Sequence, residues 1–289
     1  MARRDLRVGP VAHAGGMSER ASRARRFSRR AGAHGKECSA NPGQVPQLGL
    51  DVSETFGFPL PPMTVSERFS PIVDARPEDT AWPVMQWPPA PGIRLTGHVV
   101  ELSPCDPDRD AEPLFRALDH DAVWRHLAGR PQDPGAAAAG LKARQAQGFF
   151  VWIVRLLRPY AGLPEGAVVG TTSYLEVSAR DARLEIGGTA YAPAVWSTQV
   201  NPDAKLQLLS YAFDVLRAGR VQLKTDVRNV RSQQAIARLG ARHEGTLRRY
   251  QRRDDGTVRD TVLFSILAEE WPAVREGLLG RARGVNVDR

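Results

Sequence analysis

The sequence of 289 residues contains little cysteine and no long apolar run, and these shortages exclude several classes of protein. Its two cysteines, Cys38 and Cys105, form no disulfide framework and lack the spacing of metal ligands. The six histidines include no pair four residues apart, so we expect no zinc or other metal site. The sequence has no run of roughly 18 apolar residues, which a membrane helix would need. The N-terminus also lacks the apolar core of a secretory signal. We therefore expect a cytoplasmic protein that does not bind membranes.

The positive charge of the chain is concentrated near its N-terminus. The formal net charge is +8, and residues 1–50 alone hold ten basic and three acidic residues, a net +7. Because this segment is rich in Arg, Ser, Gly and Ala and poor in apolar residues, we expect a disordered basic tail. Three interpretations are open: an unstructured extension or a translation start placed too far upstream, an arm that binds nucleic acid, and an organelle transit peptide.

Residues 51–94 are rich in proline. Such a segment favours an extended polyproline conformation over a core of its own. It also contains Trp82 and Trp87, whose rings would be costly to leave in water. We therefore expect a proline-rich arm that lies partly on the folded domain through these two rings, and we expect the folded domain to span residues 95–280.

The hydrophobic pattern of residues 95–280 predicts an α/β fold built on a mixed sheet. Strands are expected at residues 98–102, 149–157, 167–177, 183–192, 220–227, 246–252 and 261–267. Helices are expected at residues 106–118, 134–147, 200–216, 230–239 and 269–279. Short links between the three strands of residues 149–192 favour antiparallel pairing, whereas the crossover that follows favours one parallel pair. We therefore expect a single domain in which helices cover the faces of the sheet.

The helix of residues 200–216 has a marked beginning. Asn201 is a preferred N-cap residue, and Pro202 suits the first helical position. Leu208 and Phe213 fall on an apolar face, and Lys205 falls on the opposite face, which we expect to be exposed. Because the helix lies between two strands, its free N-terminal amides provide a place for an anion.

Several sequence blocks around this helix carry a recognisable pattern. They are Leu184-Glu185-Ile186-Gly187, the segment of residues 221–245 with Asn229, Ser232, Leu239 and Gly240, and the final block Arg259-Asp260-Thr261 with Phe264, Ser265, Ile266 and Leu267. Together they resemble the GNAT N-acetyltransferases, and in particular the ribosomal-protein-alanine acetyltransferase subgroup. The resemblance covers about residues 86–275, and implies a GNAT-like acyl-CoA N-acyltransferase fold.

The resemblance implies acetyl-CoA as co-substrate and a primary amine as acceptor, on a protein N-terminus or a small molecule. It further implies that the strands of residues 183–192 and 220–227 part, so that the pantetheine arm lies between them. The pyrophosphate would then lie on the loop before the helix. The implied cofactor-binding residues are Ile186, Gly187, Thr198, Gln199, Val200, Asn201, Asn229 and Ser232.

Amide formation from a thioester needs a group that takes the proton of the amine. Glu185 is the candidate base because strand alternation places it opposite Leu184 and Ile186, although an ordinary ion-paired strand glutamate would look the same. Many family members use a tyrosine after the position of Asn229, and none occurs there. Ser232 or water is therefore the candidate proton donor, with Tyr250 more remote.

The loop before the helix departs from the pattern of the family. The usual Gln/Arg-x-x-Gly-x-Gly/Ala reads Trp196-Ser197-Thr198-Gln199-Val200-Asn201, without either glycine or the basic residue. We expect the side chains of Ser197, Thr198 and Lys205 to contribute phosphate contacts instead. The main prediction is an N-acetyltransferase, and the alternative is a weak or inactive relative that binds CoA or serves as an interaction module. Nucleic acid is a partner only through the basic tail, and monomer and homodimer are both open.

Overall fold

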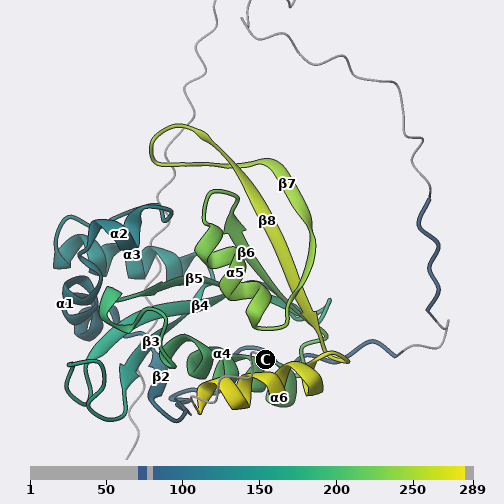
Figure 1. Ribbon diagram of the computed structural model, residues 1–289, viewed down its shortest axis with the longest axis horizontal. Helices are drawn as coiled ribbons and strands as arrows, with labels where there is room; N and C mark the ends of the chain where they lie inside the picture. The colour runs from purple at the N-terminus through teal and green to yellow at the C-terminus, as the bar shows by residue number, and fades with distance from the viewer. Residues whose placement is uncertain (1–70, 77–80, 284–289) are drawn as a thin grey trace, which may run out of the picture. The chain divides into compact units, whose positions relative to one another are not determined.

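Eight strands form one mixed sheet in the computed structural model of this protein, which describes residues 71–76 and 81–283 (Figure 1). The strands are β1 (Leu95–Thr96), β2 (Val100–Pro104), β3 (Phe150–Leu156), β4 (Val168–Ser178), β5 (Arg183–Tyr191), β6 (Arg220–Asp226), β7 (Arg242–Arg252) and β8 (Val258–Leu267). They lie in the order β1-β2-β3-β4-β5-β6-β8-β7. All neighbours are antiparallel except β5 and β6, which are parallel. The expected mixed sheet with one parallel pair is confirmed.

Helices cover both faces of this sheet. They are α1 (Pro107–Leu118), α2 (Asp121–Trp124), α3 (Pro134–Ala146), α4 (Val200–Ser210), α5 (Val230–Arg238) and α6 (Trp271–Ala282), and one π-helical turn, Tyr211–Val215, continues α4. Successive residues of a strand point to opposite faces. Val151 and Ile153 of β3 pack with the apolar side chains of α1 and α3, whereas Trp152 and Val154 pack with those of α4 and α6. Figure 1 shows the two groups of helices apart from each other.

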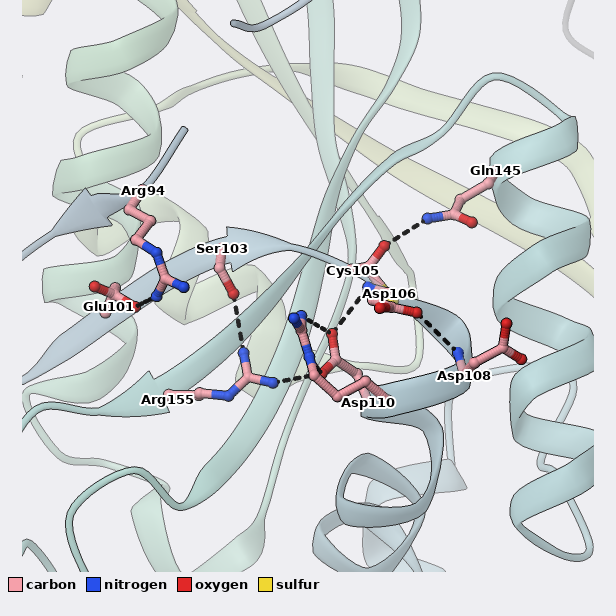
Figure 2. A network of polar contacts seen from close by, with 10 residues as sticks. Arg94, Glu101, Ser103, Cys105, Asp106, Asp108, Asp110, Gln145 and Arg155 are labelled. Carbon is pink, nitrogen blue, oxygen red and sulfur yellow. Dashed lines mark hydrogen bonds and ion pairs between the residues drawn. The ribbon is translucent and has the colours of Figure 1, made fainter. Parts of the chain in front are cut away.

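A network around Asp110 fixes α1 to the sheet (Figure 2). The carboxylate of Asp110 is fully buried and accepts a hydrogen bond of 2.6 Å from Arg155 of β3. It also accepts from Arg109 and from the backbone amide of Asp106. Asp106 caps the helix by accepting from the amide of Asp108. Because each buried charge has a partner, the network holds α1 in one position on β3.

The beginning of α4 differs from the expectation. The helix starts at Val200, Gln199 occupies the N-cap position without a side-chain hydrogen bond, and Asn201 lies inside the first turn, so the prediction of Asn201 as N-cap was wrong. The expectation of an exposed Lys205 was also wrong, because this residue is buried. On α4, Lys205 shares a face with Leu208 and Leu209, three and four residues further on, and the sheet covers that face.

The other elements lie close to their expected positions. The short β1 and α2 and the 3-10 turn Pro193–Val195 were missed, and β7 begins at Arg242 rather than at residue 246. Of the two tryptophan rings expected to pack, Trp87 lies against Phe150 and Tyr174, whereas Trp82 is 62% exposed. The basic tail of residues 1–50 lies outside the described residues. Within the part that the structure describes, no helix is both long and apolar enough to cross a membrane.

Candidate active site

The parallel strands β5 and β6 separate after their first three residues. They pair only at their first residues, from Arg183 opposite Arg220 to Glu185 opposite Gln222. Beyond this point β5 stays paired with β4 as far as Tyr191, and β6 stays paired with β8 to its end. Among the described residues, the facing edges of β5 and β6 therefore have no strand partner beyond Glu185. The gap opens into a cavity of about 1480 Å³, which we call the seam cavity.

A β-bulge bends β5 just beyond the point of separation. The register with β4 shifts between the pairs Ser173–Gly187 and Thr171–Ala190, so β5 carries one extra residue there. Gly188 lies in the bulge with a φ of +59°, a conformation that favours glycine. A Cβ on Gly187 would lie 2.6 Å from Oε1 of Glu185. The two glycines thus allow β5 to bend and the carboxylate of Glu185 to lie back against the strand.

Glu185 lines the seam cavity close to the point of separation and is 5% exposed. Its Oε2 atom forms an ion pair of 2.9 Å with Nζ of Lys224 on β6 and accepts a hydrogen bond of 3.3 Å from Gln222. Burial raises the pKa of Glu185 above its ordinary value, and the contact with Lys224 counteracts only part of that rise. The arrangement gives a buried carboxylate that takes up a proton more readily than an exposed glutamate.

Lys224 joins Glu185 to two further side chains. Its Nζ atom lies 2.6 Å from Oε1 of Glu176 and 2.9 Å from the hydroxyl of Tyr250. Burial acts to lower the pKa of Lys224, but the contacts with Glu176, Tyr250 and Glu185 outweigh it and hold the pKa above its ordinary value. The charged ammonium is therefore the fixed centre of this cluster.

Tyr250 was only a remote candidate on sequence grounds, and the structure places it at the seam cavity. The register of β7 against β8 shifts between Leu247 and Gln251, and Arg249 in between has a φ of +52°. The amide of Arg249 donates to the carboxylate of Asp260, which stabilises the bulge. This irregularity brings the ring of Tyr250 to Lys224. No local sequence pattern predicts it, because the position depends on a bulge in a distant strand pair.

The glycine-free loop adopts its conformation with strain at one non-glycine residue. Ser197 has a φ of +58°, whereas Gln199 has a right-handed φ of −67° and Asn201 is helical. Neither position that is usually glycine therefore needs a positive φ. Trp196 donates to the carbonyl of Tyr191, and the hydroxyl of Thr198 donates to the carbonyl of Val195 and accepts from the amide of Val200.

A side chain of α5 contacts this loop across the seam cavity. The guanidinium of Arg231, on the first turn of α5, lies 3.7 Å from the centre of the Trp196 ring, a cation–π contact. Asn229 caps α5, because its side chain accepts a hydrogen bond of 3.1 Å from the amide of Ser232. Asn229 thus has a structural role as a helix cap, and capping does not prevent contact with a cofactor. The side chain of Gln199 lies 3.5 Å from the hydroxyl of Tyr160 on the loop side.

The structure brings together nearly all residues that the sequence singled out. Glu185, Ile186, Gly187, Thr198, Gln199, Asn201, Asn229 and Ser232 all line the seam cavity. Val200 does not line it, and its side chain is fully buried in the core. Among the described residues, no group of three or more His, Cys, Asp and Glu side chains has the arrangement of a metal site.

Comparison with known proteins agrees with this fold. The family model described as Acetyltransferase (GNAT) domain matches residues 100–242. A solved acetyltransferase from T. thermophilus is 37% identical, with a TM-score of 0.59 over 68% of this chain and 99% of that one. RimJ of Mycobacterium smegmatis, solved in complex with CoA-disulfide, is 25% identical, with a TM-score of 0.52 over 70% of this chain and 98% of that one. The uncharacterized N-acetyltransferase YoaA of Bacillus subtilis (strain 168) is 24% identical over 167 residues, 55% of this chain and 89% of that protein.

The chain belongs to the GNAT acetyltransferase family and is an acyltransferase. Its structural neighbours include RimJ, which supports the resemblance to the ribosomal-protein acetyltransferase subgroup.

Proposed function

We propose that this protein transfers the acetyl group of acetyl-CoA to a primary amine that carries an acidic group nearby, on a protein N-terminus or on a small molecule. The observation that carries the proposal is the separation of β5 and β6 directly beyond the buried Glu185. The residues fit acetyl-CoA because the parted strands leave a free backbone edge for the pantetheine amides and the start of α4 offers amides to phosphate. The thioester of acetyl-CoA supplies the activated acetyl group.

Glu185 is the proposed base. The acceptor attacks as a neutral amine, forming a carbon–nitrogen bond while the carbon–sulfur bond breaks. The proton of the amine passes to the carboxylate of Glu185, directly or through a water molecule. Burial assists this step because it raises the pKa of Glu185. Lys224 holds the carboxylate in place through the 2.9 Å contact and so acts as a positioning residue.

The leaving thiolate needs little help, since a thiol has a pKa of roughly 8.5. Two hydroxyl groups that line the seam cavity, those of Ser232 and Tyr250, are the proposed donors of its proton. Backbone amides near the bulge at Gly188 are proposed to polarise the thioester carbonyl. The bulge supports this role because it turns part of β5 away from its regular pairing with β4.

The proposed acidic group on the acceptor follows from the arginines at the seam cavity. Arg253 is already bound to Asp226 through two hydrogen bonds. Arg259 also lines the cavity, but within the described part of the chain its only side-chain partner is the hydroxyl of Thr261, at 3.1 Å. Burial lowers the pKa of Arg259, although the charges of Asp226 and Glu185 partly offset this. A carboxylate on the acceptor would give this guanidinium a counter-charge.

An acceptor panel tests the proposal. Purified full-length protein is incubated with acetyl-CoA and with peptides that differ only in whether Asp, Ala or Lys follows the free N-terminus, and CoA release is measured together with the mass of the product. We expect the acidic peptide to have the highest kcat/KM, and Arg259→Met to remove that preference. Arg248→Met, at an exposed residue outside the cavity lining, is the matched control. Equal rates for all three peptides would contradict the acidic preference, and no acetylated product from any amine would contradict the transferase proposal.

A further inference from the structure

Lys205 is a buried lysine for which the chemistry described above has no use. It lies on the second turn of α4, is 4% exposed, and lines the seam cavity. Its Nζ atom is 3.0 Å from the hydroxyl oxygen of Thr189 on β5 and 3.5 Å from that of Thr172 on β4. Over the described ranges of the chain, no carboxylate forms an ion pair with it. A buried ammonium group without a counter-charge lowers the stability of the folded protein. A role in ligand binding therefore explains the presence of Lys205 better than a role in stability does.

Among the residues that the structure describes, no other ionisable group forms a hydrogen bond or an ion pair with Nζ of Lys205. On α4 itself, Asp203 accepts through Oδ2 from the backbone amides of Val99 and Val100, and its buried Oδ1 has no partner within the described part of the chain. On β4, the hydroxyl of Tyr174 donates to the carbonyl of Leu208, and on β5 the buried hydroxyl of Tyr191 has no partner. Because no neighbouring charge compensates it, burial lowers the pKa of Lys205 to about 7. Without an anion, the amine is therefore partly neutral at physiological pH.

The position of Lys205 relates it to the start of α4. Side chains on a helix tilt toward its N-terminus, so the ammonium lies nearer to the first turn than its own Cα atom does. In that region the amides of Gln199 and Asn201 donate to no acceptor within the described residues. The start of α4, the helix dipole and Lys205 thus present positive potential to the same cavity.

We propose that Lys205 supplies the buried positive charge that binds the diphosphate of acetyl-CoA, in place of the basic residue that the loop lacks. The inference rests on the proposed function, since it requires that acetyl-CoA enters the seam cavity. It has one consequence that a structural lysine would not show. Binding of the diphosphate stabilises the charged amine, so the protein takes up a proton from solvent onto Nζ of Lys205 as acetyl-CoA binds.

Isothermal titration with acetyl-CoA at pH 8 tests the inference. The observed enthalpy is measured in buffers with different enthalpies of ionisation, and its dependence on the buffer gives the number of protons taken up. We expect an uptake of about one proton per acetyl-CoA for the wild-type protein. Lys205→Met should abolish the uptake and weaken binding by about tenfold or more. Lys142→Met, at an exposed lysine of α3 outside the cavity lining, should leave both quantities unchanged.

The outcomes separate the two proposals. Binding of acetyl-CoA to the wild-type protein without proton uptake, or with equal affinity for Lys205→Met, overturns the role of Lys205 and leaves the transferase proposal intact. No binding to the wild-type protein overturns both. Dephospho-CoA, which keeps the diphosphate and lacks the 3′-phosphate, should show the same loss of affinity with Lys205→Met, and an absence of that loss contradicts the assignment to the diphosphate. Because Met fills a similar volume, we expect a folded variant, and the wild-type proton uptake does not depend on any variant.

Discussion

Lys224 and Lys205 line the same cavity, the first half-buried and the second buried, but their surroundings are opposite in kind. Lys224 contacts two carboxylates and a phenol, and these contacts raise its pKa. Lys205 contacts two threonine hydroxyls, and burial lowers its pKa to about 7. The part of the cavity around Glu185 is therefore complete before any ligand binds. The part around α4 lacks a counter-charge that a ligand can bring.

The largest expected effect comes from replacing the carboxylate of Glu185, in the part of the cavity that is complete without a ligand. Glu185→Gln keeps the shape of the side chain and removes its basicity. We expect kcat to fall by about 10²–10⁴-fold, the range for loss of a general base, with the affinity for acetyl-CoA unchanged. Glu176→Gln is the matched control, because Glu176 also contacts Lys224 but is exposed. Equal rates for wild type and Glu185→Gln in steady-state assays would exclude Glu185 as the base.

Removal of the ammonium group of Lys224, which Glu185 and Glu176 share, should affect the free energy of unfolding and its pH dependence. In Lys224→Met, Glu185 remains buried without its counter-charge, and we expect a loss of about 3–5 kcal/mol in the free energy of unfolding. The pKa of Glu185, already raised in the folded wild type, should rise further. Such a group stabilises the folded state only while it is protonated. The stability of the variant should therefore fall as pH rises from the ordinary glutamate pKa of 4.5 through the raised folded value.

Two measurements check this prediction. Urea unfolding at pH values from about 4 to about 8 measures how the free energy of unfolding depends on pH. The rate at saturating acetyl-CoA against pH should show an acidic limb at higher pH in the variant than in the wild type, since Glu185 must be ionised to act as base. An unshifted limb would mean that Lys224 does not control the protonation of Glu185.

The bulge on β5 allows a sharper test with two neighbouring glycines. Gly187→Ala places a methyl group 2.6 Å from Oε1 of Glu185, so the carboxylate must move. We expect kcat to fall by about tenfold to a hundredfold, because small displacements of a catalytic group are costly. Gly188→Ala meets only Ser173 Oγ, at 3.7 Å, but strains a residue with a φ of +59°. It should cost about 1 kcal/mol of stability with little change in kcat. The reverse pattern in kinetics and thermal unfolding would contradict the proposed position of Glu185.

The smallest expected effect distinguishes capping from cofactor contact on α5. Asn229→Ala removes the cap on the amide of Ser232 and should cost about 1 kcal/mol of stability. Ser232→Ala keeps that amide, and it should leave the melting temperature nearly unchanged. If either side chain contacts acetyl-CoA, titration calorimetry will show a loss of affinity in that variant. Unchanged affinity in both would leave Asn229 with the structural role alone.

Local sequence patterns were sufficient for most of the fold. Alternation and apolar runs located the long strands, and the positions of Asp106 and Asn229 before apolar helical patterns located two helix starts. The order of elements predicted the one parallel pair. Glu185, Asn229 and Ser232 were found through the resemblance to the family, and all three line the seam cavity. These features are carried by residues that are neighbours in the sequence.

Only the tertiary structure decided the electrostatics of the cavity. Lys205 was expected on the exposed face of a helix, but it lies on the buried face, where threonines of β4 and β5 contact its Nζ atom. Tyr250 lies in a strand far along the chain from Glu185, and a bulge between β7 and β8 brings its ring to Lys224. A helical or strand pattern reports the polarity of one segment and not what packs against it. The pKa values of buried groups depend on that packing, because burial and neighbouring charges come from segments far apart in the chain.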